Sequence, residues 1–108
     1  MQEPIIVESH SMPIELHCDL EVDPTKEKDL VNTFHTVFEP TIGKQPGFVS
    51  VTLLKLRAAQ ADHRLVIGFQ TEEQRLTWVA SGDHQRVWPQ MEQNLKGSKF
   101  TAALWDKL

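Results

Sequence analysis

The chain has 108 residues, a mass of 12.4 kDa, a formal net charge of −4 and a single cysteine, Cys18. This length allows one domain, and the lone cysteine excludes an internal disulfide and any multi-cysteine metal site. The 11 Lys and Arg residues are scattered, so nucleic acid is not an expected partner. No apolar run approaches the ~20 residues of a membrane-spanning helix, and the chain does not begin with a secretory leader. We therefore expect a cytoplasmic protein without membrane contact.

The N-terminal part predicts a polar arm followed by a strand. Residues 1–12 form the arm, whose short apolar run "IIV" would suit an edge strand. From residue 13 apolar and polar side chains alternate strictly, as expected for a strand with one buried face. The apolar positions of this strand are Ile14, Leu16, Cys18, Leu20 and Val22.

A helix is predicted next, because Asp23 suits an N-cap and Pro24 suits the first helical position. Its apolar residues have the spacing of one buried stripe, and Pro40 is expected to kink or end the regular part before Gly43. The stripe comprises Leu30, Val31, Phe34, Val37 and Phe38.

The C-terminal half predicts a hairpin, two short helices and a closing strand. Residues 48–57 and 63–70 are rich in β-branched and apolar residues and suit an antiparallel hairpin. Thr71 and Gln74 form a capping box at the start of a helix. A second helix should follow "SGD" and run to about Leu95, broken or bent at Pro89. The last stretch, "SKFTAALWDKL", suits a closing strand.

This order, β-α-β-β-α-α-β, predicts an α+β domain over residues 13–108, with a four-stranded antiparallel sheet and its helices on one face. On the other face the second strand is expected to show Val49, Val51 and Leu53. That is more apolar surface than a small monomer usually leaves in water. We therefore expect a homodimer that pairs through the open sheet face.

Three stretches carry a resemblance to a known family: "KQPGFVSVTLLK" at 44–55, "RLVIGFQTEEQRLTWVAS" at 64–81, and "HQRVW" at 84–88. They resemble the antibiotic biosynthesis monooxygenase-like domains, over roughly residues 13–106. The resemblance implies a ferredoxin-like fold that pairs into a dimeric α+β barrel. The family includes cofactor-free oxygenases of polycyclic phenols, haem-degrading enzymes, isomerases of signal molecules and members without assigned activity, and fold alone does not choose among them.

Haem degradation is disfavoured within this resemblance. Haem-degrading relatives use an asparagine on the first strand, a tryptophan after the third strand and a histidine ligand ten residues later. Trp78 matches the tryptophan, but the other two positions are Cys18 and Trp88. The indole nitrogen of Trp88 has no lone pair for iron. His84, about one turn earlier, is the residual candidate for a ligand.

The favoured function is a monooxygenase without metal or organic cofactor that acts on a small aromatic, phenolic or quinol-type metabolite. Such a site needs a base, a donor for the anion and aromatic walls. His84 is the expected base, since it lies between two tryptophans, and Arg86 is the expected anion partner. The chain has no tyrosine, so a phenolic donor would be replaced by His84, Arg86 or water. The expected substrate-binding residues are Trp78, Trp88, Cys18, His35 and Phe38.

Each of these residues also has a simpler interpretation. Trp78 suits a core position, Cys18 a small hydrophobic side chain, and His35 a half-buried histidine with its own partner. His84 and Arg86 follow a helix start and suit a solvated surface. Two other functions therefore stay open: a non-catalytic dimeric binding or accessory protein, and an isomerase of a small oxygenated metabolite.

Overall fold

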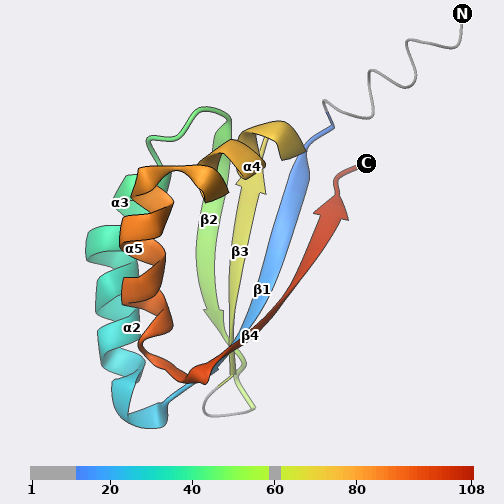
Figure 1. The fold of residues 1–108 in the computed structure, drawn as a ribbon. Helices are drawn as coiled ribbons and strands as arrows, with labels where there is room; N and C mark the ends of the chain where they lie inside the picture. Colours follow the sequence, from blue (N-terminus) through green and yellow to red (C-terminus); the bar gives the residue numbers. More distant parts are fainter. Residues whose placement is uncertain (1–11, 59–61) are drawn as a thin grey trace, which may run out of the picture.

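The computed structural model describes residues 12–58 and 62–108, so all but the last residue of the predicted arm, residues 1–12, lies outside the described part. Four strands form one antiparallel sheet in the order β2-β3-β1-β4, with helices packed on one face (Figure 1). The strands are β1 (Ile14–Val22), β2 (Phe48–Lys55), β3 (Asp62–Phe69) and β4 (Leu95–Asp106). The predicted α+β class and the four-stranded antiparallel sheet are confirmed.

The helix after β1 changes its hydrogen-bonding pattern along its length. It begins as a 3-10 turn, η1 (Pro24–Lys26), capped by Asp23, whose carboxylate accepts a hydrogen bond from the Thr25 N–H at 2.9 Å. It continues as α2 (Glu27–Thr33), a π-helical turn η2 (Phe34–Phe38) and α3 (Glu39–Ile42). In the π turn the Glu39 N–H donates to the Phe34 carbonyl, five residues back.

The regular α-helical pattern is interrupted by the π turn just before Pro40, which has no N–H to donate, and the helix then continues through Pro40 to Ile42. The buried residues recur every four positions, at Leu30, Phe34, Phe38 and Ile42. Val31, expected in the buried stripe, is instead 38% exposed.

The second helical segment consists of α4 (Glu72–Ala80) and α5 (Gly82–Glu92). Thr71 caps α4 as predicted, because its hydroxyl oxygen accepts from the Gln74 N–H at 3.1 Å. α5 runs uninterrupted through Pro89 and ends at Glu92, before the predicted Leu95. Leu95 belongs to β4, where it pairs with Val22.

One hydrophobic core fills the space between the sheet and the helices. The sheet contributes alternate residues of β1 and β3, and the helices contribute large side chains. The fully buried core includes Val22, Leu30, Phe38, Ile42, Leu65, Phe69, Val87 and Met91. This core fixes α4 and α5 above the sheet, where the candidate site lies.

The open sheet face is more polar than expected, because β2 contains a bulge. The pairing of β2 with β3 shifts between Phe48 and Ser50, so Val49 is an extra residue and the alternation of side chains changes there. Val51 and Leu53 pair with the buried Ile67 and Leu65 and pack against the core. Placing them on the open face was therefore wrong.

Candidate functional site

A cavity of about 240 Å³ lies between the helices and the sheet. Most of its wall is apolar or aromatic, and residues of η2, α4, α5 and three strands contribute to it. The lining residues are Leu16, Cys18, Phe38, Leu65, Ile67, Arg75, Trp78, Val79, His84, Trp88, Phe100 and Ala102. Five of the expected site residues, Cys18, Phe38, Trp78, His84 and Trp88, are thus brought together around one space.

A tight corner between α4 and α5 positions the two central residues. Ser81 separates the helices; its hydroxyl donates to the Trp78 carbonyl at 2.7 Å and accepts from the His84 N–H at 3.1 Å. The same serine therefore ends one helix and caps the next. This corner brings Trp78 and His84 into contact although they are six positions apart in the sequence.

Aromatic rings surround the His84 imidazole on two sides. Trp78 meets it edge-on, with ring centroids 5.0 Å apart, and Trp88 stacks on it at 6.3 Å with an interplanar angle of 21°. His84 and Trp88 are four residues apart on α5 and so share one helix face. Phe38 contacts both tryptophans edge-on and closes the far wall.

His84 is held as a neutral base. Burial lowers its pKa below the ordinary value of 6.5, because the charged form loses hydration in this apolar setting. Its Nδ1 atom is buried and has no hydrogen-bond partner among the described residues. A buried ring nitrogen without a partner is costly in a folded protein, and a ligand could pair with it only if a neighbouring side chain moved aside.

Cys18 belongs to the sheet wall of the cavity and is 4% exposed. Burial raises the pKa of its thiol to about 11, and the neighbouring Asp19 adds to the shift. Since the thiolate is the reactive form, Cys18 is suited to be a wall residue and not a nucleophile.

The structure brings Arg75, not Arg86, to the cavity. Arg86 forms an ion pair with Asp83 at 3.2 Å on the surface, and its side chain is 56% exposed. Arg75 lines the cavity and is 15% exposed. Arg75 lies three residues before Trp78, so the helical spacing that places them on one face could have revealed it.

His35 also lies outside the cavity. Its side chain is 61% exposed, and its Nδ1 is 3.1 Å from a carboxylate oxygen of Glu39, one helical turn further along. The expectation that His35 binds substrate is not supported by this position. Phe34 and Phe38 occupy the buried face of that helix, and His35 follows Phe34 on its flank.

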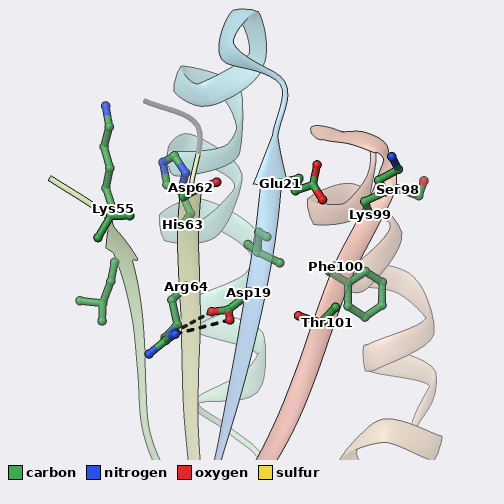
Figure 2. A pocket seen from close by; sticks show the side chains of 13 residues that line it. Asp19, Glu21, Lys55, Asp62, His63, Arg64, Ser98, Lys99, Phe100 and Thr101 are labelled. Atoms are coloured by element: carbon green, nitrogen blue, oxygen red, sulfur yellow. Dashed lines mark hydrogen bonds and ion pairs between the residues drawn. The ribbon is translucent and has the colours of Figure 1, made fainter. Parts of the chain in front are cut away.

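A larger groove of about 730 Å³ lies at the end of the sheet where β2 leads to β3, and all four strands contribute to it (Figure 2). In Figure 2 Asp19 and Arg64 point toward each other across neighbouring strands, with Nε and Oδ1 2.6 Å apart. Lys55 contacts Glu27 at 2.8 Å. Three charged residues of the groove, Asp19, Arg64 and Lys55, thus already have partners. No group of three potential metal ligands occurs in residues 12–58 or 62–108.

Comparison with solved structures supports the fold. The chain is similar to a Caulobacter crescentus protein assigned by name to the antibiotic biosynthesis monooxygenases (TM-score 0.81, 11% identity, 97% of this chain and 98% of that chain). It is also similar to a conserved Methanosarcina mazei protein (TM-score 0.79, 14% identity, 94% of this chain and 99% of that chain). A third similar structure is that of SnoaB, a cofactor-independent oxygenase from Streptomyces nogalater (TM-score 0.76, 14% identity, 90% of this chain and 94% of that chain).

Sequence comparison adds no further relative: neither a protein-family model nor a curated protein matches the chain. The structural likeness therefore shows the fold, an α+β ferredoxin-like arrangement that this chain shares with these structures. No helix in the described part of the chain is long and apolar enough to cross a membrane.

Proposed function

We propose that the protein is a cofactor-independent monooxygenase of a small hydroxylated aromatic compound. The observation that carries the proposal is the half-buried His84 imidazole, which lies between two tryptophans in an apolar cavity and whose Nδ1 has no partner among the described residues. Among structures of the same fold, SnoaB is named a cofactor-independent oxygenase. The substrate is proposed from the chemistry of the cavity.

The cavity suits a substrate that reacts with oxygen once it has lost a proton. The methylene carbon of an anthrone gives one proton to His84. The resulting carbanion, which is stabilised as a phenolate, transfers an electron to O2. The resulting radicals join in a C–O bond to give a peroxide, which takes a proton from the imidazolium. Loss of the second C–H proton then breaks the O–O bond, so that one methylene and one O2 yield one carbonyl and one water.

Arg75 is the donor that we assign to the developing anion in place of Arg86. It lines the cavity on the same face of α4 as Trp78, and its side chain is mostly buried. A donor already aimed at the position where negative charge forms lowers the barrier without reorganisation. Trp78 and Trp88 hold the flat ring.

The size of the cavity limits the substrate. A volume of about 240 Å³ lies below the ~300–1,000 Å³ of pockets for drug-sized ligands. A small fused-ring aromatic suits this space, and a haem-sized macrocycle does not. This agrees with the absence of a histidine at position 88, where haem-degrading relatives have their ligand.

The test is oxygen consumption with anthrone as the substrate. We expect the protein to accelerate formation of the quinone over the rate in buffer, with one O2 consumed per anthrone and no hydrogen peroxide released. Heat-denatured protein provides the control. Binding of anthrone without any acceleration would contradict the proposal and would favour a non-catalytic binding protein.

We also propose that two copies pair through the open sheet face. Trp105 and Leu54 are 58% and 48% exposed, and Trp105 lies beside His17 of β1, with ring centroids 5.8 Å apart. Two-fold pairing would cover these side chains. Light scattering at micromolar concentration should give about twice the 12.4 kDa of one chain, and a monomer mass would contradict the pairing.

A further inference from the structure

The guanidinium in the cavity wall has a fixed partner outside it. Arg75 Nε and Nη2 donate to the two oxygens of Glu72, each at 2.7 Å. Arg75 lines the cavity, whereas Glu72 is not among the lining residues and its side chain is 35% exposed. Glu72 therefore holds the guanidinium from the solvent side.

The bidentate contact between Arg75 and Glu72 leaves part of the guanidinium available to a ligand. Arginine has five N–H donors, and Glu72 engages two of them. The remaining donors can bind an oxygen atom in the cavity. Glu72 also lies in the first turn of α4, where the helix dipole favours a negative charge.

The cavity consequently presents donors and an acceptor but almost no net charge. Glu72 offsets the charge of Arg75, His84 has a pKa lowered by burial, and the Cys18 thiol has a pKa raised to about 11. An aromatic carboxylate entering this space loses its hydration and finds no uncompensated cation. An uncharged hydroxyl group can donate to His84 and accept from Arg75.

We propose that Glu72 determines the ligand class of this cavity: by neutralising Arg75 from outside, it selects uncharged hydroxylated aromatics and rejects aromatic carboxylates. The inference rests on the proposed function in taking this cavity as the substrate site. It adds a specificity-determining residue that does not itself touch the substrate. Arg75 is the donor, and Glu72 sets both its position and its effective charge.

The experiment compares two ligands with the same ring system, 2-naphthol and 2-naphthoate, by equilibrium binding near neutral pH. We expect the native protein to bind 2-naphthol more tightly. Glu72→Gln keeps the shape of the side chain but leaves Arg75 with its full charge. It should raise the affinity for 2-naphthoate by about tenfold or more, which corresponds to roughly 1.4 kcal/mol, and change the affinity for 2-naphthol by less than about threefold.

A matched control lies next to Glu72 in the chain. Glu73 is in the same first turn of α4 but is exposed, and Glu73→Gln removes the same charge without touching the Arg75 contact. It should leave both affinities nearly unchanged. In the double variant Glu72→Gln/Arg75→Met the gain for 2-naphthoate should disappear, since the gain depends on the released guanidinium.

A gain for 2-naphthoate without a gain for 2-naphthol cannot result from misfolding, because exposed apolar surface would bind both ring systems. The inference is overturned if Glu72→Gln brings no gain, if Glu73→Gln brings an equal gain, or if the native protein prefers 2-naphthoate or binds neither ligand. Failure of the proposed function is separate: it shows as normal discrimination between the two ligands with no acceleration of anthrone oxidation.

Discussion

The two hollows of this protein differ in size and in chemistry. The groove at the sheet end measures about 730 Å³ and is lined by charged residues such as Asp19 and Arg64, which pair with each other (Figure 2). The cavity between helices and sheet measures about 240 Å³, yet it contains a buried imidazole nitrogen without a partner. In the larger hollow Asp19 and Arg64 pair with each other, whereas in the smaller one a ring nitrogen of His84 has no partner among the described residues. The unsatisfied polar atom, and not the volume, is what points to the smaller hollow as the candidate site.

The largest effect on stability should come from the cavity wall. Trp78 is 3% exposed, and Trp78→Ala should lower the free energy of unfolding by about 3–5 kcal/mol through lost contacts and the space left behind. Leu76→Ala on the same helix, at a position that is 52% exposed, should cost about 0.5 kcal/mol or less. Chemical denaturation measures both. Equal costs would show that the cavity wall is not part of the packed core.

The next effect concerns the reactivity of Cys18. A thiol pKa raised from 9.0 to about 11 reduces the thiolate fraction about a hundredfold, and burial slows access further. Iodoacetamide at pH 8 should therefore label the native protein at least about a hundredfold more slowly than the denatured protein. Fast labelling of the native form would show an open, polar cavity like the groove.

A smaller effect is the pH dependence of His84. The folded-state pKa lies below 6.5, so the neutral base is present above that pH, and turnover should fall as the pH drops through the folded-state pKa. Stability follows the same direction: the contribution is present above pH 6.5 and is lost as the pH falls through the folded-state pKa. NMR titration can identify the His84 signal by its loss in His84→Ala. A pKa above 6.5 would contradict a desolvated site.

The smallest effect is expected in the groove. Arg64→Met removes an exposed ion pair between β1 and β3, and such pairs contribute little. Turnover of anthrone should stay within about twofold of the native rate, because the site lies on the other face of the sheet. A large loss in this variant would move the reaction to the groove.

The sequence predicted most of the architecture because its strands and caps follow local rules. Alternation fixed β1, and the Thr71 side chain fixed the start of α4. The exception on the sheet was the bulge at Val49, where one extra residue reverses the facing of Val51 and Leu53. Simple alternation contains no signal for such a residue.

The candidate site was predicted where helical spacing was decisive. His84 and Trp88 are four residues apart and share a face, while Arg86, two residues from His84, points elsewhere. Arg75 was missed although its spacing from Trp78 is the same kind of signal. The two belong to one helix, and the hydrogen bonds of Ser81 to Trp78 and His84 form the corner that joins that helix to His84.

The central claim is that His84 is the base of the reaction, and the direct test is the rate of anthrone oxidation by His84→Ala. Loss of a positioned base should lower turnover by roughly 10²- to 10⁴-fold. The protein should stay folded, because the loss of ring contacts is offset in part by removal of a buried nitrogen that has no partner among the described residues. Turnover that is unchanged in a folded His84→Ala protein would contradict the account.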